Sequence, residues 1–221
     1  FTVGDLTQVT VKVDGKDFTG NTITANGRHT LEVTDEVGHT TTVYFTIAKD
    51  VPEVKLITDG NEIVADNEML THYFNKDVTI KISNNVEIKS AILTTPDGDV
   101  ELTQEEILNG KTITAIDEKH NSYKLVVIDV ADRSVTVNFV TDLKNPTSSV
   151  VSETYTTDQL ITFEDESGVT ATLDGASIES GKVTLTEEGL HTLMLTDKAG
   201  NSVVYYPVID KRAPEVSFVM N

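Results

Sequence analysis

Residues 189–197 read GLHTLMLTD, and residues 27–35, which lie 162 positions earlier, read GRHTLEVTD. The match continues without a gap until residues 214–216, which read PEV and repeat residues 52–54 at the same spacing. Agreement this dense between distant stretches indicates that one structural unit occurs at least twice in the chain.

A third, more diverged copy lies between these two, 94 positions after the first. Tyr123 takes the place of His29 in this copy, and Asp129 takes the place of Asp35. Self-similarity at fixed spacings is typical of an array of like modules, each of which is one supersecondary unit.

Within each copy, hydrophobic residues alternate with polar ones. Leu31 and Val33 point to one face of an extended strand, whereas Thr30 and Glu32 point to the other. This period of two predicts half-buried antiparallel strands. The pattern predicts burial or exposure for particular residues. We expect burial of Leu31, Val33, Phe45, Leu125, Val127, Phe139, Leu193 and Leu195, and exposure of Glu32, Thr42 and Thr136.

Turn residues separate the alternating stretches. Asp14-Gly15, Asp97-Gly98 and Asp174-Gly175 mark one set of turns, because Asp accepts local backbone hydrogen bonds and Gly supplies a positive φ. Several short strands at such spacing favour an all-β chain of antiparallel β-sandwiches.

The copies divide the chain at short junctions that contain proline. We predict a first segment (residues 1–50) that lacks its opening strand, an enlarged middle segment (51–144) and a third segment (145–212). Residues 213–221 are expected to be the first strand of a following module. In the middle segment, Thr103 can cap one helical turn that Gly110 ends.

The formal net charge is −19. It is divided as about −3 over residues 1–50, −8 over 51–144 and −8 over 145–221. A field of this sign repels nucleic acid and anionic lipid, and no apolar run is long enough to cross a membrane. We therefore expect no nucleic-acid partner and no direct membrane insertion. The chain has no cysteine, which excludes disulfides, zinc thiolates and a cysteine nucleophile.

No pattern of catalytic residues is present. The five histidines lack metal-ligand spacing, no Gly-x-Ser-x-Gly elbow occurs, and no glycine-rich phosphate loop follows a strand. His29 and His191 share the face of the core aliphatic residues, so we expect them to pack with their polar edges at the rim. The sequence indicates that this section is not an enzyme.

A cation site is the remaining candidate. Asp50, Asp142 and Asp210 lie at the segment junctions, where calcium bound by carboxylates would stiffen the joint. The alternative is that these aspartates form polar turns that close each segment. No other cofactor is expected.

The motif Thr-Asp-Lys-Ala-Gly-Asn at residues 196–201, a hydrophobic strand and Ile-Asp-Lys at 209–211 before Ala-Pro-Glu-Val resemble the bacterial immunoglobulin-like (Big-type) tandem repeats of Gram-positive cell-surface proteins. Residues 161–216 match best, and the middle segment departs at Asp132, where the turn glycine would lie. The resemblance implies tandem immunoglobulin-like sandwiches outside the cell, at the cell surface or in the wall, with neighbouring repeats as partners.

Such modules serve stalks, adhesins and envelope hydrolases alike, so the resemblance implies a scaffold and not a ligand. The first hypothesis is a non-catalytic stalk or spacer. The alternatives are a middle segment that binds a glycan or a host surface protein, and an accessory region of a cell-envelope hydrolase. No basic segment followed by an apolar run opens the sequence, so we expect an internal section of a longer secreted or wall-bound protein.

Overall fold

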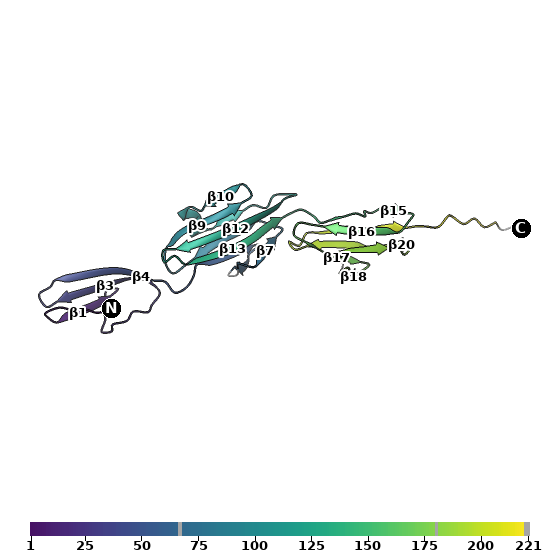
Figure 1. Ribbon diagram of the computed structural model, residues 1–221. Helices are drawn as coiled ribbons and strands as arrows, with labels where there is room; N and C mark the ends of the chain where they lie inside the picture. Colours follow the sequence, from purple (N-terminus) through teal and green to yellow (C-terminus); the bar gives the residue numbers. More distant parts are fainter. Residues whose placement is uncertain (66–67, 180, 219–221) are drawn as a thin grey trace. The chain divides into compact units, whose positions relative to one another are not determined.

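The computed structural model describes residues 1–65, 68–179 and 181–218 (Figure 1). Strands hold 53% of the chain and helix 3%, so the predicted all-β class is confirmed. The chain forms two compact units, which consist of Phe1–Leu70, Thr79–Lys111 and Lys124–Val137, and of Thr71–Val78, Thr112–Tyr123 and Asn138–Asn221. Within the described residues, no helix has the length and apolar character needed to cross a membrane.

The first segment forms one antiparallel sheet in the order β2-β1-β3-β4. Its strands are β1 (Val9–Val13), β2 (Lys16–Asp17), β3 (Gly27–Asp35) and β4 (Thr40–Ile47). The predicted Asp14-Gly15 turn joins β1 to β2, with φ of 51° and 75° at the two residues, a left-handed conformation that suits Asp and Gly.

The middle segment forms two sheets, in the orders β10-β9-β12-β13-β7, whose strands are labelled in Figure 1, and β11-β8-β5-β6. Its strands are β5 (Glu53–Thr58), β6 (Asn61–Val64), β7 (Thr71–Phe74), β8 (Val78–Ser83), β9 (Ile88–Thr95), β10 (Gly98–Glu101), β11 (Lys111–Ile113), β12 (His120–Asp129) and β13 (Ser134–Asp142). The pairing of β7 with β13 is parallel, whereas β9 pairs with β10 and β12 in the antiparallel sense.

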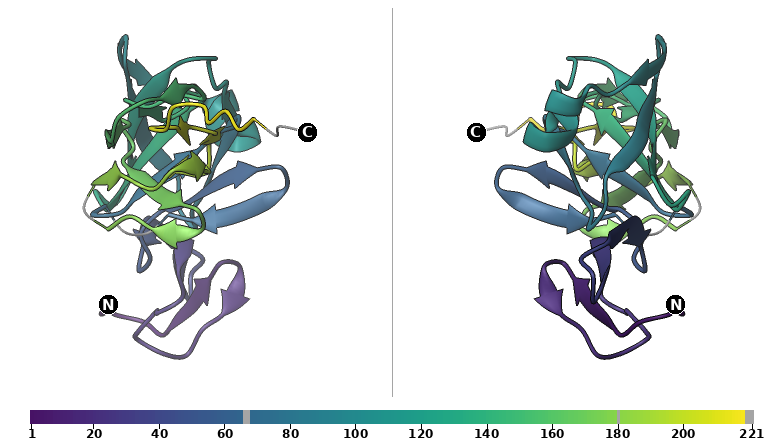
Figure 2. Two further views of the ribbon diagram at one scale, coloured as in Figure 1. Left: turned by 90° about the vertical axis from the view of Figure 1, so that its right-hand side faces the viewer. Right: turned by 90° about the vertical axis from the view of Figure 1, so that its left-hand side faces the viewer.

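One helical turn interrupts the strands of the middle segment, as the sequence predicts. Helix α1 (Gln104–Asn109, teal in Figure 2) begins after Thr103, whose hydroxyl accepts from the Glu106 amide while the Glu106 side chain accepts from the Thr103 amide. This reciprocal pair is a capping box. Gly110 ends the helix at a φ of 97°.

The third segment contains three small sheets, in the orders β14-β16-β19, β15-β23-β20 and β18-β17-β21-β22. Its strands are β14 (Thr147–Ser148), β15 (Thr154–Tyr155), β16 (Gln159–Glu164), β17 (Val169–Leu173), β18 (Ala176–Ser177), β19 (Lys182–Leu185), β20 (Gly189–Leu190), β21 (Leu193–Asp197), β22 (Ser202–Tyr205) and β23 (Val208–Ile209). All three sheets contribute to one hydrophobic core, which includes Ile161, Leu193 and Ile209.

Two strands of the third segment that lie far apart in sequence run in the same direction. Near the start of the segment, β15 pairs in parallel with β23 at its end, through Thr154 opposite Val208 and Tyr155 opposite Ile209. The Val208 amide donates to the Glu153 carbonyl at 2.9 Å, and the Asp210 amide donates to the Tyr155 carbonyl at 2.9 Å.

The alternation of buried and exposed residues agrees with the prediction in the middle and third segments. Five of the residues expected inside are completely buried, namely Leu125, Val127, Phe139, Leu193 and Leu195. Leu31 is also buried, but Val33 and Phe45 are only half-buried, because the described residues of the first segment supply a single sheet.

The outward-facing prediction holds for Thr42 and is wrong for Glu32 and Thr136, which are half-buried. Glu32 lies on a central strand directly opposite Lys12 on one side and Thr42 on the other. These side chains cover part of its surface, since directly opposed residues on one face of a sheet lie about 5 Å apart.

The sheets of the described residues never mix strands from two predicted segments. The boundary between the two compact units, however, falls inside the middle segment. The division into three segments therefore stays a prediction. Residues 213–218 form no strand, and Met220 of the expected further strand lies outside the described residues.

Candidate functional site

One aspartate in each segment lies opposite the first residue of its partner strand, although a β-bulge between Ile128 and Asp129 shifts the register in the middle segment. Asp35 lies opposite Val9, Asp129 opposite Ile88, and Asp197 opposite Val169. Each of these aspartates ends a strand and begins a tight turn. The loop before the opposing strand is therefore brought beside the aspartate in all three segments.

Four positions before the opposing strand residue, that loop carries Asp5, Asn84 and Asp165 in the first, middle and third segments. The pair at the turn is thus Asp with Asp in two segments, and Asp with Asn in the middle one. In the third segment, one more acidic residue joins the pair.

Asp142, Asp165 and Asp197 form this group, which we call the acidic triad. Each offers one carboxylate oxygen, and the three oxygens lie within 4.8 Å of one another. Asp142 is the last residue of β13, Asp165 follows β16, and Asp197 ends β21. Of the residues that the structure describes, only these form a group of three or more potential metal ligands at such spacing.

Asp197 is fixed by its own turn. Its Oδ1 accepts from the Gly200 amide at 2.7 Å and from the Asn201 amide at 2.8 Å. The Asn201 side chain donates to Asp197 Oδ2 at 2.7 Å and to the Asp142 carbonyl at 2.8 Å. Asn201 therefore links the turn to the end of β13.

Asp142 is fully buried, and both of its carboxylate oxygens have hydrogen-bond partners. Its Oδ2 accepts from the Ser167 hydroxyl and faces His120 Nδ1 at 2.9 Å, while Oδ1 accepts from the Lys144 amide at 3.0 Å. Burial opposes ionisation, yet these bonds from Ser167, His120 and Lys144 hold the pKa of Asp142 below its ordinary value. Asp142 is thus held as a carboxylate.

Asp165 is half-buried and responds in the opposite direction. Burial raises its pKa, the hydrogen bond from the Ser167 amide at 2.7 Å lowers it, and the charges of Asp142 and Asp197 raise it further. The net result is a raised pKa, which means that the third negative charge is unfavourable where it lies.

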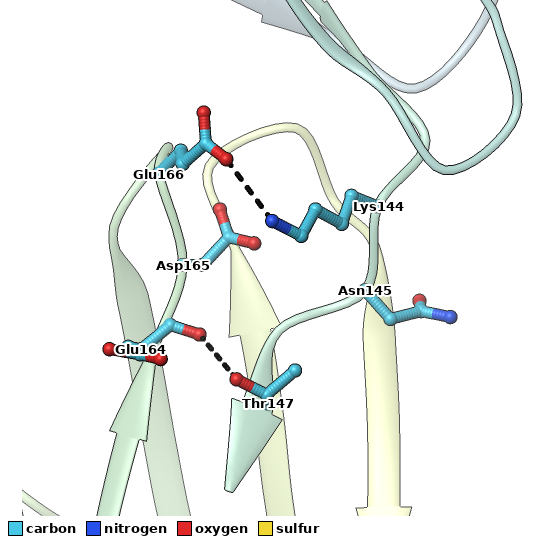
Figure 3. Close-up of a pocket in the computed structure, with 6 residues that line it drawn as sticks. All are labelled: Lys144, Asn145, Thr147, Glu164, Asp165 and Glu166. Carbon is cyan, nitrogen blue, oxygen red and sulfur yellow. Dashed lines mark hydrogen bonds and ion pairs between the residues drawn. The ribbon is translucent and has the colours of Figure 1, made fainter.

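Lys144 is paired with a carboxylate outside the acidic triad. Lys144 Nζ lies 3.1 Å from Glu166 Oε1, across a pocket of about 420 Å³ that Asp165 also lines (Figure 3). In this view the Asp165 carboxylate lies beside the Lys144 side chain. The Thr147 hydroxyl closes the lower part of the pocket by donating to the Glu164 carbonyl at 3.4 Å.

The acidic triad has the chemistry of a hard-cation site. Calcium takes six to eight oxygen ligands at about 2.3–2.6 Å, so two oxygens bound to one ion lie at most about 5 Å apart. The spacing of the triad falls within that limit. Water or carbonyl oxygens would complete the coordination shell.

The three aspartates predicted as calcium ligands belong to three different junctions of the chain. Asp142 joins the triad. Asp50 is exposed, and its Oδ2 accepts from the side-chain amides of Asn26 and, at 3.2 Å, of Asn85. Asp210 is exposed, and its Oδ1 accepts from the Arg212 amide at 3.2 Å.

Asp165 and Asp197 were not among the predicted ligands. The alignment of the copies carries a signal for both, because Asp197 repeats Asp35 and Asp165 aligns with Asp5. The convergence of the two with Asp142 depends on strand register, which an alignment does not contain.

No family model matches the chain. An outer cell wall protein of Brevibacillus brevis is 41% identical to it over 71 residues, which cover 28% of this chain and 7% of that protein. Fibronectin(III)-like modules of Clostridium thermocellum CbhA superpose with a TM-score of 0.25 and 14% identity, over 76% of this chain and 100% of theirs.

SGBP-B of the Bacteroides ovatus mixed-linkage glucan utilization locus gives a TM-score of 0.23 and 14% identity, over 91% of this chain and 61% of that one. A 1.5-MDa bacterial ice-binding adhesin gives a TM-score of 0.23 and 11% identity, over 93% of this chain and 86% of that one. Superpositions at these TM-scores carry no argument about function. The chain spans about 7% of the length of the cell wall protein to which it is similar.

Proposed function

We propose that this chain is a non-catalytic section of a bacterial cell-surface protein, in which like β-modules follow one another as a stalk or spacer. The carrying observation is the pairing that recurs around Asp35, Asp129 and Asp197, each of which lies opposite the first residue of its partner strand. A repeated unit with sheets of its own adds length without requiring any new site.

Short connections support a spacer role. In the first connection, β4 ends at Ile47 and β5 begins at Glu53. In the second, β13 ends at Asp142 and β14 begins at Thr147. Pro52 is buried in the first connection and Pro146 in the second. Proline fixes its own φ and restricts the residue before it, so these connections have few conformations.

The proposed location is outside the cell, on the surface or in the wall of a Gram-positive bacterium. The similarity to an outer cell wall protein supports this location, as does the resemblance of residues 161–216 to Big-type repeats. The net charge of −19 agrees with a surface that keeps modules soluble and apart from other anionic polymers.

Calcium at the junction before the third segment is part of the proposal. The acidic triad joins the end of β13 to two loops of the third segment, so an ion there would tie the connection to the segment that follows. The raised pKa of Asp165 supports this, because a divalent cation would offset the charge that Asp142 and Asp197 impose on it.

The middle segment supports a second candidate function, as a module that binds a glycan or a host protein. Strand β10, helix α1 and strand β11 fill its additional sequence between the Asp97-Gly98 turn and β12. An accessory role beside a hydrolase remains a further alternative, which the domain composition of the whole protein would decide.

A replacement in the producing bacterium tests the spacer function. The third segment would be exchanged for an unrelated β-sandwich of similar length, and antibody access to the distal part of the protein would be measured on intact cells. A spacer retains full access after the exchange. Loss of surface display or of attachment to a target, at unchanged protein level, would contradict the proposal.

Array binding separates the second candidate from the first. The full chain would be applied to glycan and host-matrix arrays at about 10 µM. The spacer function predicts no saturable binding. Saturable binding that substitutions on the exposed face of α1, such as Leu108→Ser, remove would favour the adhesion function, since Leu108 is 81% exposed.

A further inference from the structure

Two histidines occupy the same buried position in the first and third segments. His29 lies on β3, His191 lies just before β21, and each is 6% exposed. The Nδ1 atom of His29 is 2.8 Å from Asp14 Oδ2, and its Nε2 is 2.9 Å from the Ala25 carbonyl oxygen.

His191 repeats this arrangement with different neighbours. Its Nδ1 is 2.7 Å from Asp174 Oδ2, and its Nε2 is 3.0 Å from the Glu187 carbonyl oxygen. Both ring nitrogens of both histidines therefore face oxygen atoms that can only accept hydrogen bonds.

A neutral imidazole cannot satisfy this geometry. It carries one N–H, so either tautomer leaves a nitrogen lone pair directed at a carbonyl or carboxylate oxygen less than about 3 Å away. A protonated ring donates from both nitrogens and meets both acceptors. In each segment, only an imidazolium ion would donate to both oxygens.

Each aspartate also holds a backbone group. Asp14 Oδ1 accepts from the Thr30 amide at 2.8 Å, and Asp174 Oδ1 accepts from the Thr192 amide at 2.8 Å. Asp14 and Asp174 have left-handed φ values of 51° and 50°. One carboxylate in each segment therefore ties the Asp-Gly turn to the neighbouring strand and to the histidine at once.

We propose that His29 and His191 are protonated clamps on the Asp-Gly turns, so that these turns of the first and third segments weaken as the solution becomes alkaline. Tyr123 fills the equivalent position of the middle segment and stacks on Phe139, with ring centroids 4.9 Å apart. It offers no imidazole to titrate.

The groups around the two rings agree with this assignment. The Asp14 carboxylate, followed by the Ala25 carbonyl, raises the pKa of His29 against the effect of burial, and the Phe45 ring of β4 lies 5.5 Å away. Burial opposes charge on His191, but Asp174, the Glu187 carbonyl and the charges of Asp174 and Glu187 raise its pKa.

A raised histidine pKa fixes the direction of the pH effect. The stabilisation is complete below the ordinary value of 6.5 and is lost as the pH rises through the higher value of the folded state. Each unit by which the folded pKa is raised corresponds to about a tenfold change in the folding equilibrium.

Nitrogen NMR of the full chain tests the protonation state. We expect both ring nitrogens of His29 and His191 to carry protons at about pH 7.5. Asp174→Asn keeps an oxygen for the Thr192 amide but removes the charge, so the His191 midpoint should move to lower pH while the His29 midpoint stays in place. A single N–H on either ring at that pH, or an unmoved His191 midpoint in the variant, would overturn the proposal.

Hydrogen exchange supplies a second test that does not depend on that variant. The Asp174 amide donates to the Thr192 carbonyl at 2.8 Å, and its protection, corrected for intrinsic exchange, should fall between pH 6.5 and 9. In His191→Tyr, which installs the residue of the middle segment, this fall should disappear. An equal fall in the two proteins would show that another group is responsible.

Discussion

The turns of the middle and third segments both begin at an aspartate opposite the first residue of a partner strand, but their charge balance is opposite. Asp129 Oδ2 accepts from the Asn84 side chain at 3.2 Å and lies 3.6 Å from Arg133 Nε, so neighbouring groups of the same segment compensate its negative charge. Asp197 has Asp165 and Asp142 beside it instead. Two residues distinguish the third-segment turn, which suits a cation, from the middle one. They are Asp165, which replaces Asn84 in the loop, and Asp142 at the end of β13.

A change at one loop residue can therefore alter the charge of a turn within an antiparallel sheet. Asn84 and Asp165 occupy the same position before β9 and β17. An amide donates a hydrogen bond to the neighbouring carboxylate, whereas a carboxylate repels it.

The largest expected effect is the loss of Asp142. In Asp142→Ala, His120, Ser167 and the Lys144 amide lose a buried partner, so the third segment should be destabilised by about 3 kcal/mol. Urea unfolding in chelator measures this. Asp50→Ala is the matched control at an exposed junction and should cost less than about 1 kcal/mol. Equal losses in the two variants would break the comparison.

Calcium should stabilise the third segment and leave the turn of the middle segment unaffected. At a free concentration of 100 times its Kd, an ion that binds only the folded state adds about 2.7 kcal/mol. Scanning calorimetry in millimolar calcium and in chelator measures the shift. Asp197→Asn should abolish the shift and Asp50→Asn should retain it. No shift in the unmodified chain would remove calcium from the proposed function.

Asp165→Asn should stabilise the chain in chelator at neutral pH, by up to about 1 kcal/mol, because it removes a charge that Asp142 and Asp197 oppose. The penalty for ionised Asp165 is complete above its raised pKa and absent below the ordinary value of 3.8. The gain should therefore shrink in urea unfolding as the pH falls toward 3.8.

The reverse substitution at the equivalent position of the middle segment should have the opposite effect on stability. Asn84→Asp places a second carboxylate beside Asp129 and removes its amide donor, so it should destabilise the chain at neutral pH. Opposite signs for the two exchanges support the charge argument. A stabilising Asn84→Asp would contradict it.

The smallest expected effect is at Asp210. It is exposed and accepts only from the Arg212 amide two residues later among the bonds described, so Asp210→Ala should change the free energy of unfolding by less than about 0.5 kcal/mol. The calcium shift should be unchanged in this variant. A loss of that shift would restore Asp210 as a ligand.

The sequence was sufficient for the features that depend on local pattern. Alternation identified the buried faces around Leu125 and Leu193, and the spacing of Thr103 and Glu106 identified the start of α1. Both signals lie within a few residues of the chain, where side-chain direction follows from strand or helix geometry.

Features that depend on pairing between distant strands could not be obtained in the same way. The parallel pairing of β7 with β13 joins residues more than 60 positions apart, and nothing in either stretch specifies the other. The acidic triad is of this kind. Asp142 could be proposed as a junction residue, but its partners follow from the register of β17 with β21.

The parallel pair of β15 and β23 determines how the third segment would respond to tension. Because β15 is near the start of the segment and β23 is at its end, pulling on the two ends draws these strands in opposite directions along their lengths. The bonds from Val208 to Glu153 and from Asp210 to Tyr155 would then share the load in shear, whereas a hairpin opened from its ends gives way one bond at a time. Forced unfolding is governed by the unfolding rate, so this short ladder would determine how long the third segment resists a steady pull.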